Sequence, residues 1–397
     1  MRIATQADLA ETAARHQTEG TALGYYNFLV GPTAWHFTSG LNLQYTDNVL
    51  STHDPQDDFL LQPNLTTQMH WPVTLDNSLD ISFNAGYSQH IFHSYLDQFF
   101  ITSGSGFTFD IFVGECKINL HDQINITQNS YQSPGVSSGN QNLESLQNSA
   151  GTSVTWDLGK LVPNIGYDHV NIISLVQNGL PDTTSDNFNG TLGFPLLAAI
   201  TVGAEAGGSL ISYGSQTVNP GLTAQSATQW SAGLFGNWRF SDYVSVQLHG
   251  GYTDYMPGGR ITGQSAGDDA GFYFSASITH RVNQWLSYTI SAGRSTDLSS
   301  AGQVQTRTYV QFNPTYHLFH NYYISTPIAY QLGTEPGYTP LSGVADYDQL
   351  TAGITVGRQI TKKLDVNLNY QYVREDSTLE VLAYTDDIIA LNLTYQF

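Results

Sequence analysis

The chain has 397 residues, of which 12% are charged, about half the share of roughly 25% that is usual in soluble domains. Its net charge of −20 disfavours a nucleic-acid partner, because a phosphate-binding surface needs clustered lysine and arginine. Only 40% of the residues are hydrophobic, and no apolar run is long enough to mark a transmembrane helix. The polar residues are mainly Asn, Gln, Ser, Thr and Gly, which suit a barrel wall with one face toward lipid and one toward water. The single Cys116 excludes an intrachain disulfide and a cysteine-rich metal site.

Residues 1–33 precede the first sustained alternation of apolar and polar residues. We expect this segment to be a periplasmic lead-in, either disordered or with one short helix over 6–16. Its sequence lacks the apolar core of a signal peptide. An outer-membrane location therefore implies a signal in the precursor that this chain does not contain.

From residue 34 onward, apolar and polar residues alternate, which predicts β-strands whose two faces differ. The alternation predicts strands at 34–48, 58–71, 79–90, 97–112, 116–129, 147–158, 162–176, 185–195, 199–212, 225–240, 243–256, 270–282, 285–295, 303–318, 321–332, 347–359, 363–374 and 380–397. These are eighteen strands, an even number that brings both ends of a barrel to one side. The alternation breaks within 97–180, which indicates β-bulges there and leaves sixteen strands as the alternative.

The segments between these strands are alternately short and long. Short connectors cover 239–243, 280–285, 318–323 and 359–364, whereas loops rich in Gly, Pro, Asp and Ser cover 256–269, 295–302 and 332–346. Aromatic residues gather near the strand ends, where an amphipathic ring suits a membrane interface. A soluble β-sandwich would carry Lys and Glu on its outward face, and these strands do not. We therefore expect an all-β fold over 34–397, a transmembrane antiparallel up-and-down β-barrel.

The last strand alternates without any charge up to the final residue. Its apolar face carries Ile389, Leu391, Leu393, Tyr395 and Phe397. This pattern resembles the C-terminal signature of bacterial outer-membrane proteins, which ends in an aromatic residue and is recognised by the barrel assembly machinery. The resemblance implies that Leu391, Leu393, Tyr395 and Phe397 form the assembly signal. It also implies that this strand pairs with the first strand near Trp35.

A second motif lies in the stretch 41–71, which has a Y-x-D-N strand end, an acidic loop and then an apolar strand with a proline. The residues that carry it are Tyr45, Asp47, Asn48, Asp57, Asp58, Phe59 and Pro63. The stretch resembles the first hairpin of the β-barrel porin 2 family of outer-membrane proteins. Some members of that family are associated with the production of extracellular polysaccharide, but the resemblance implies no particular substrate.

Sparse charges at inward positions are the candidates for a functional site, because a charge within a membrane-spanning wall needs water or a partner. The predicted pore-lining residues are Lys117, Asp157, Glu205, Arg239, Arg281, Arg307 and Asp365, together with the inward aromatics Tyr273 and Tyr309. Charges on opposing walls shape the field of a pore, and they equally form ion pairs that stiffen the wall. An inward tyrosine either stacks on a sugar ring or simply donates a hydrogen bond.

The stretch GQSAG at 263–267 matches the Gly-x-Ser-x-Gly motif of hydrolases. That motif works only on a strand–turn–helix elbow, and Ser265 lies in a Gly- and Asp-rich loop with no helix after it. We therefore expect no catalytic residue and no enzyme.

Two patterns raise the question of a metal site. The first is a pair of histidines three residues apart, as in His90/His93 and His317/His320. Residues three apart on a strand point to opposite faces, so neither pair converges. The second is an acidic loop, at 53–58 and 264–269, and neither loop fits a calcium-binding EF-hand. Solvated surfaces, or divalent ions that bridge lipopolysaccharide, explain such loops equally well, so we expect no metal and no cofactor.

The function expected from these features is a porin-like channel that conducts small hydrophilic solutes or a saccharide. A barrel of eighteen strands leaves an aqueous lumen, and the acidic excess predicts a mild preference for cations. The alternative is a structural or interaction protein with a blocked lumen and acidic surface loops, and an outer-membrane hydrolase is the least favoured reading. The expected partners are outer-membrane lipid and lipopolysaccharide, the barrel assembly machinery, the solute, and further copies of the chain as a homo-oligomer.

Overall fold

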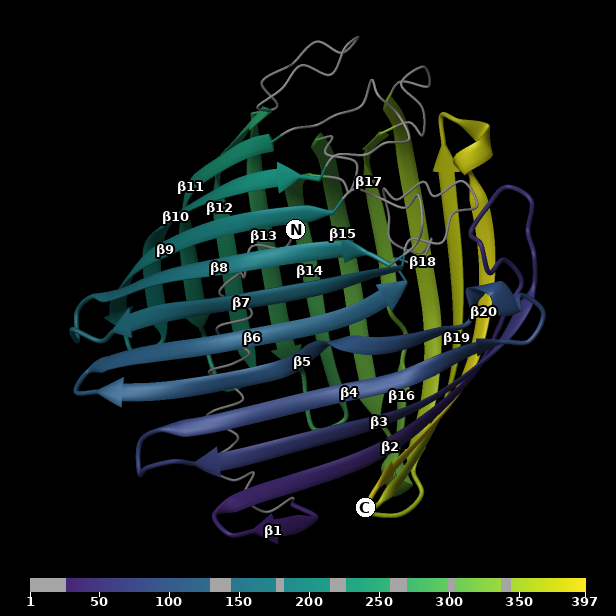
Figure 1. Cartoon of the computed structure of the whole chain (residues 1–397), viewed down its shortest axis with the longest axis horizontal. Coiled ribbons are helices and arrows are strands. Elements are labelled where there is room, and N and C mark those ends of the chain that lie inside the picture. The colour runs from purple at the N-terminus through teal and green to yellow at the C-terminus, as the bar shows by residue number, and fades with distance from the viewer. Residues whose placement is uncertain are drawn as a thin grey trace.

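One antiparallel sheet curls round and closes on itself to form the barrel in Figure 1. The computed structural model describes residues 26–128, 144–175, 182–214, 226–257, 270–298, 304–336 and 344–397. Its strands are β1 (Phe28–Val30), β2 (Thr33–Thr46), β3 (Asp58–Pro72), β4 (Ser78–His90), β5 (Gln98–Val113), β6 (Cys116–Gln128), β7 (Glu144–Trp156), β8 (Val162–Ser174), β9 (Thr183–Leu197), β10 (Ile200–Tyr213), β11 (Ser226–Arg239), β12 (Val244–Pro257), β13 (Gly271–Arg281), β14 (Leu286–Leu298), β15 (Val304–His317), β16 (Tyr322–Ser325), β17 (Ile328–Pro336), β18 (Val344–Gln359), β19 (Leu364–Ser377) and β20 (Tyr384–Gln396). Among the described residues, the helices are the short 3-10 turns η1 (Ser94–Leu96), η2 (Phe319–Asn321) and η3 (Glu380–Leu382), and none has the length to cross a membrane.

Eighteen of these spans make up the wall, as the alternation predicts, because β1 is a short addition and β16 and β17 form one interrupted span. Both parts of that span keep a single register against β15, with Ser325 opposite Thr315 and Ile328 opposite Phe312. The interruption comes from Pro327 on the span and Pro314 on β15, since proline has no backbone N–H to donate to the ladder.

The barrel closes where β20 pairs with β2, from Thr38 opposite Gln396 to Thr46 opposite Ile388. The predicted pairing of the last strand with the first is therefore confirmed. Leu391 and Leu393 pair with Leu43 and Leu41 across this seam. All four of these leucines face outward, so the seam continues the apolar outer surface.

Below the last residue, β1 occupies the edge of β2 that β20 leaves free. Phe28 pairs with Trp35, and the backbone N–H of Phe397 donates to the carbonyl of Phe37 at 3.2 Å. Asn27 joins the two ends, because its side-chain oxygen accepts from Phe37 N at 3.0 Å and its amide nitrogen donates to the Phe397 carbonyl. Part of the expected lead-in is therefore a strand, while the helix expected over 6–16 lies outside the described residues.

Strand β5 carries the irregularity that the broken alternation indicates. Its register shifts against β4 between Ser82 and Ala85, and against β6 between Ile101 and Ser105. Glycine is required at the second shift, because Gly106 has φ of +155° and a side chain there would collide with the backbone of β6. The bulges explain why sequence parity fails here without any change in the number of strands.

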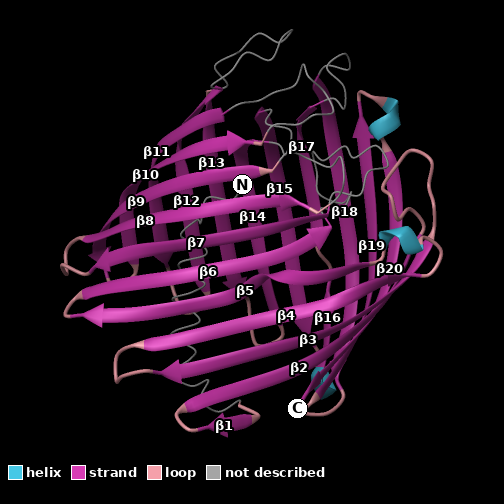
Figure 2. Ribbon diagram, viewed as in Figure 1, coloured by secondary structure: helices cyan, strands magenta, loops and turns pink. Residues whose placement is uncertain are grey.

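The two ends of the barrel differ in the length of their connections. Tight turns such as 114–115, 198–199 and 240–243 join the strands at one end, and the C-terminus lies at this end too. At the other end, the described loops include 47–57, 91–97 and 378–383, which carry η1 and η3 (Figure 2). We call these the short-turn end and the long-loop end. In outer-membrane barrels the short turns are periplasmic.

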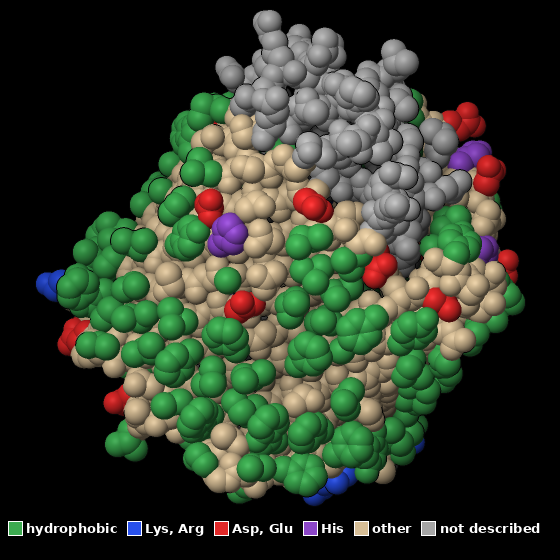
Figure 3. Space-filling model, viewed as in Figure 1, with side chains coloured by type: hydrophobic (Ala, Val, Ile, Leu, Met, Phe, Trp, Pro, Cys, Tyr) green, Lys and Arg blue, Asp and Glu red, His purple; other side chains and the backbone are tan. Residues whose placement is uncertain are grey.

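Large apolar side chains cover the outside of the wall, as the green surface in Figure 3 shows. Ile165, Leu234 and Phe272 are each about 70% exposed to solvent in the isolated chain, at 69%, 69% and 74%. A soluble protein does not leave so continuous an apolar surface uncovered, whereas a bilayer covers it.

Aromatic residues mark the long-loop edge of this surface. Several donate a hydrogen bond to an aspartate on the next strand, namely Tyr167 to Asp186 at 2.7 Å, Trp230 to Asp254 at 3.2 Å and Tyr370 to Asp387 at 2.5 Å. A ring that is apolar on its body and bonded at its tip suits the boundary between lipid and water.

Candidate functional site: the lumen wall

Glu205, His249 and Tyr273 meet on the inner face of the β10–β13 wall. Glu205 Oε2 lies 3.0 Å from His249 Nδ1, and Tyr273 Oη donates to Glu205 Oε1 at 2.8 Å. Only 18% of the Glu205 side chain and 9% of the His249 side chain are exposed. A carboxylate in this setting is tolerated because both of its oxygens have a donor.

Glycines on the strands in between make this network possible. Tyr273 is opposite Gly251 on β12, which is opposite Gly233 on β11, and Gly233 is opposite Glu205 on β10. A β-carbon at Gly251 would lie 2.6 Å from Tyr273 Oη, and one at Gly233 would overlap the same atom. The tyrosine therefore lies along the wall over two residues without side chains and reaches a partner three strands away.

The same arrangement recurs on the wall formed by β6–β8. His121 Nε2 lies 2.6 Å from Asp168 Oδ1, and the two residues flank Gly151 on the strand between them. A β-carbon at Gly151 would be 2.7 Å from His121 Nε2. A glycine thus again leaves room for a polar pair that joins strands which are not neighbours.

Further pairs of inward charges lie closer to the short-turn end. Lys117 Nζ lies 2.9 Å from Asp110 Oδ2, and His70 Nδ1 lies 2.5 Å from Asp80 Oδ1. Tyr323 Oη donates to Asp365 Oδ1 at 3.3 Å. Lys117 balances the charge of Asp110, whereas His70 and Tyr323 give Asp80 and Asp365 a hydrogen-bond partner.

The predicted pore-lining residues fall into two groups. On the inner face of strands lie Lys117, Glu205, Arg307, Asp365, Tyr273 and Tyr309. Near the short turns lie the other three, Asp157, Arg239 and Arg281. That any of them lines an open pore stays a prediction.

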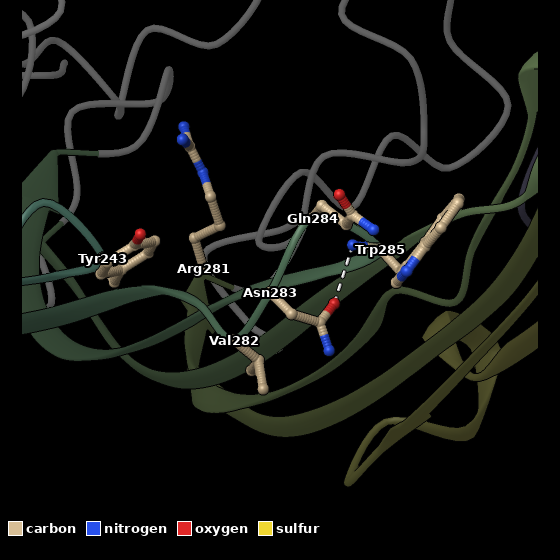
Figure 4. Close-up of a pocket in the computed structure, with 6 residues that line it drawn as sticks. All are labelled: Tyr243, Arg281, Val282, Asn283, Gln284 and Trp285. Atoms are coloured by element: carbon tan, nitrogen blue, oxygen red, sulfur yellow. Dashed lines mark hydrogen bonds between the residues drawn. The ribbon is translucent and has the colours of Figure 1, made fainter.

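The three residues of the second group lie at the rim because Arg239 and Arg281 are the last residues of their strands and Asp157 lies just beyond the end of its strand. Asp157 follows β7 and accepts a hydrogen bond from Gly159 N within the turn at 2.8 Å. Arg239 is the last residue of β11 and pairs with Asp242 of the next turn at 3.4 Å, with both side chains more than half exposed. Arg281 ends β13 beside a shallow hollow of about 670 Å³. The hollow is lined by Tyr243, Arg281, Val282, Asn283, Gln284 and Trp285 (Figure 4).

The partners of these charges are the functional candidates that the sequence does not single out. His121 and Asp168 lie in the region where the alternation breaks, so their faces are not readable from parity. His249 does alternate onto the polar face of its strand, but only the fold shows that Glu205, 44 residues earlier, lies beside it. The one sequence feature that points to these polar pairs is a glycine inside an otherwise regular strand, as at Gly151, Gly233 and Gly251.

Buried polar residues hold the long-loop end together. Asp58 is fully buried and accepts from Phe59 N at 2.7 Å and from Phe92 N at 3.0 Å, with His93 Nδ1 3.2 Å away. It therefore fixes the loop 91–97 to the start of β3. Leu50 and Leu96 pack beneath these loops as a small apolar cluster.

The Y-x-D-N motif closes the seam between β2 and β20 at this end. Asn48 donates to the carbonyls of Thr52 at 2.8 Å and Thr385 at 2.9 Å, and its side-chain oxygen accepts from Thr52 N. Asp47 exchanges hydrogen bonds with Asp387 in both directions. The motif thus has a structural role, because it ties the first long loop to the last strand.

Within the described residues, the histidine pair His90/His93 does not converge on one site. His90 and His93 each lie near a different carboxylate, Asp97 at 3.7 Å and Asp58 at 3.2 Å. In the part of the chain that the structure describes, no group of three or more His, Cys, Asp or Glu is placed to hold a metal. The side chain of His320, the motif GQSAG with Ser265 and the acidic loop 264–269 lie outside the described residues.

Charge divides unevenly between the two mouths. At the long-loop end, exposed acids include Asp54, Asp57, Asp182 and Glu380. At the short-turn end, exposed bases include Lys160, Arg239, Arg281, Lys362 and Lys363, beside acids such as Asp157 and Asp242. In Figure 3 the blue groups lie at the left and lower edges, where Figure 1 shows the short turns. The long-loop mouth is therefore the more negative of the two among the described residues.

Solved structures with a similar fold are outer-membrane proteins of the Occ and Opd type. OccK5 (OpdH) of Pseudomonas aeruginosa is 11% identical, with a TM-score of 0.51 over 93% of this chain and 98% of that one. OccAB3 of Acinetobacter baumannii is 11% identical, with a TM-score of 0.50 over 93% of this chain and 100% of that one. OpdK of Pseudomonas aeruginosa, solved with vanillate, is 10% identical, with a TM-score of 0.50 over 91% and 98%.

The sequence itself matches no protein-family profile and no curated protein. At such low identity, the likeness to the solved structures concerns the fold. That fold is a closed 18-stranded antiparallel barrel with an apolar outer surface, and it places the chain in the bacterial outer membrane, as the sequence predicts.

Proposed function

We propose that the chain is a porin-like channel for small hydrophilic solutes. The observation that carries the proposal is the chemistry of the inner faces of a closed eighteen-stranded wall. Uncharged polar residues dominate there, for example Ser275, Ser277, Thr279, Ser287, Thr289, Ser291, Gln311, Asn313, Asn367 and Asn369. A barrel of this strand number encloses space for water, and such side chains suit a hydrated lumen.

The charges support a preference for cations over anions. The inward carboxylates Asp110, Asp168 and Glu205 each have a nitrogen of Lys117, His121 or His249 within 3.0 Å, so they are less available to a passing ion than free carboxylates. The long-loop mouth keeps exposed acids such as Asp54 and Asp57 without an equal number of bases among the described residues. A negative mouth raises the local concentration of cations at the entrance. OpdK was solved with vanillate, a carboxylate, and we expect this mouth to admit such a solute poorly.

Single-channel recording of the purified protein in planar bilayers tests the proposal. We expect stable open steps of nanosiemens order and, under a KCl gradient, a reversal potential of the sign set by K⁺. Absence of any open step from correctly folded protein would overturn the proposal. A reversal potential of the opposite sign would overturn the cation preference while leaving the channel intact.

One observation favours the alternative of a structural protein with a blocked lumen. Val373 and Ile388 point inward near the long-loop end, yet they are only 3% and 5% exposed. Side chains buried on the inner face have protein packed against them. The bilayer recording separates the two functions, because a blocked barrel gives no open steps.

We also propose that the chain is a distant member of the β-barrel porin 2 family. The proposal is supported by the roles of the motif residues, since Asp47 and Asn48 hold the first long loop in place and Asp58 holds the loop 91–97. The test is to determine the structure of a member with an established sequence match. Equivalent contacts at its Y-x-D-N motif would support membership, and a free loop there would contradict it.

A further inference from the structure

Three inward tyrosines lie along the wall instead of pointing into the lumen. Tyr273 of β13 lies over Gly251 and Gly233, and Tyr309 of β15 lies over Gly293 of β14. A β-carbon at Gly293 would be 3.0 Å from both Cε1 and Cζ of Tyr309. Tyr323 of β16 covers Gly357 in the same way, nearer the short-turn end.

A ring whose one face rests on backbone presents its other face to the lumen. Tyr273 and Tyr309 are neither buried nor fully exposed, in keeping with one covered face and one open face. The hydrogen bond from Tyr273 to Glu205 fixes its ring in this position. We call these two rings the tyrosine shelf.

The two tyrosines of the shelf are two strands apart in the wall and differ in height by two residues. Arg307 on β15 is opposite Ser295 on β14. The register of β14 against β13 continues to place Ser295 level with Tyr273, so Tyr273 and Arg307 are at the same height. Tyr309 is two residues further along β15 on the same face. Strand spacing and rise place the two tyrosine Cα atoms about 12 Å apart. A ligand that touches both rings must therefore be longer than a single sugar ring.

The surroundings of the shelf are polar and close to neutral. Tyr309 is opposite Gln331, and Ser291 and Ser277 hydrogen-bond across β14 and β13 at 3.4 Å. Glu205 and Arg307 are charges of opposite sign on either side. Hydroxyl and amide groups offer both donors and acceptors, and flat rings offer an apolar surface.

This combination fits one class of ligand. A saccharide has apolar C–H faces that stack on an aromatic ring and a rim of hydroxyl groups that needs mixed donors and acceptors. An aromatic carboxylate with a single ring would also stack, but it is too short to touch both tyrosines. We propose that the tyrosine shelf binds neutral oligosaccharides on their way through the lumen, an inference that rests on the proposed channel function.

The rings have a structural role in any case, because they cover glycines and stiffen the wall. If the role of the rings is purely structural, sugar should not bind in the lumen even when the barrel is intact. Substitution of Tyr309 separates the two roles, since its hydroxyl makes no hydrogen bond on which the proposal depends. Tyr309→Phe keeps the ring and Tyr309→Ala removes it.

The experiment uses maltohexaose as the probe and the purified full chain in planar bilayers. We expect saturable interruptions of the open current in the native protein and in Tyr309→Phe. In Tyr309→Ala we expect binding weakened by roughly fivefold to tenfold, the effect of one aromatic contact. Tyr316→Ala is the matched control, because Tyr316 lies on the outward face of the same strand and is 42% exposed there. It should leave the interruptions unchanged.

The inference would be overturned if the channel opened but was not blocked by maltohexaose, cellohexaose or dextran oligomers. It would also be overturned if maltohexaose blocked the native protein and Tyr309→Ala equally. Failure of the channel itself is recognised separately, as absence of open steps. In that case, calorimetric titration of maltohexaose into the detergent-solubilised protein decides. Binding that Tyr309→Ala weakens supports the shelf, and no binding overturns it.

Discussion

The two ends of the barrel are built on different principles. At the short-turn end, adjacent strands are joined by a few residues, and the charges there are exposed or lie in simple pairs such as Arg239 with Asp242. At the long-loop end, order comes from buried polar groups such as Asp58 and Asn48, which hold loops to strands. Carboxylates therefore stabilise the structure at the long-loop end, whereas those at the short-turn end lie at the surface and contribute little to stability.

This difference separates stability from selectivity. A carboxylate that accepts several buried N–H groups is committed to structure and is shielded from the solute. An exposed carboxylate at the mouth contributes little to stability but acts on ions at a distance. Substitutions at the long-loop end should thus fall into two clear classes, according to burial and not to charge.

Substitution of the buried carboxylate should have the largest effect. Asp58→Ala removes the acceptor for Phe59 N and Phe92 N and the partner of His93. We expect a loss of about 3–5 kcal/mol in the free energy of unfolding, the cost of breaking a buried charged network. Urea unfolding in lipid vesicles, followed by tryptophan fluorescence, measures this. The exposed neighbour Asp57→Ala is the control, and equal losses in both variants would refute the division between the classes.

We expect a smaller loss in the free energy of unfolding for a substitution in the middle of the wall, between the two ends of the barrel. Gly233→Ala places a methyl group on Tyr273 Oη and 2.7 Å from the Gly250 carbonyl oxygen. The network with Glu205 must then open, at a cost of about 1–3 kcal/mol typical of overpacking. Gly250→Ala is the control, because its new β-carbon would meet nothing closer than the Tyr273 carbonyl oxygen at 3.8 Å. The same unfolding assay compares the two variants, and a neutral Gly233→Ala would show that the ring is free to move.

At the short-turn end, the contact of Asn27 with Phe397 should contribute less to stability than the two contacts above. Asn27→Ala removes the side-chain bonds to Phe37 and Phe397, and we expect about 1 kcal/mol for these partly exposed bonds. The yield of folded, heat-modifiable protein on gels should fall modestly. Asn283→Ala, in another short turn, is a suitable comparison because the side-chain oxygen of Asn283 accepts from Trp285 N and Leu286 N within its own turn. A yield that collapses for Asn27→Ala alone would mean that the seam governs assembly.

The exposed acids should show almost no effect on stability and a measurable one on selectivity. Asp54→Asn combined with Asp57→Asn should move the reversal potential under a KCl gradient toward zero. The shift should shrink as salt rises, because the Debye length falls from about 10 Å at 0.1 M to 3 Å at 1 M. Lys362→Gln combined with Lys363→Gln provides the comparison at the other mouth and should move the potential the opposite way. Reversal-potential shifts of the same sign and size in the two double variants would contradict the proposed difference in charge between the two mouths.

The strand number and the faces of most strands follow from the sequence, because a membrane wall imposes a strict period of two. The broken alternation within 97–180 indicates bulges, which the structure places in β5 around Gly104 and Gly106, but the sequence does not give their positions. The prediction also misses the interruption at Pro327, since the pairing continues in register on both sides of it.

The site is less predictable for a physical reason. Inward charges such as Glu205 and Asp365 are readable from parity, but their partners lie on other strands. His121 and Asp168 are 47 residues apart in the chain, and only pairing through Gly151 brings them together. The residues at strand ends, such as Asp157, depend on where a turn begins, which an alternating pattern does not mark.

The place of β1 has a consequence for how the ring of strands finds its alignment. Because β1 fills the edge of β2 as far as Trp35, the last strand cannot slide further along that edge than the position of Phe397. A slip by one residue would turn every leucine of β20 inward, and a slip by two would leave the seam staggered. Strand β1 thus limits how far β20 can move along β2, and the closed barrel has one alignment of its strands.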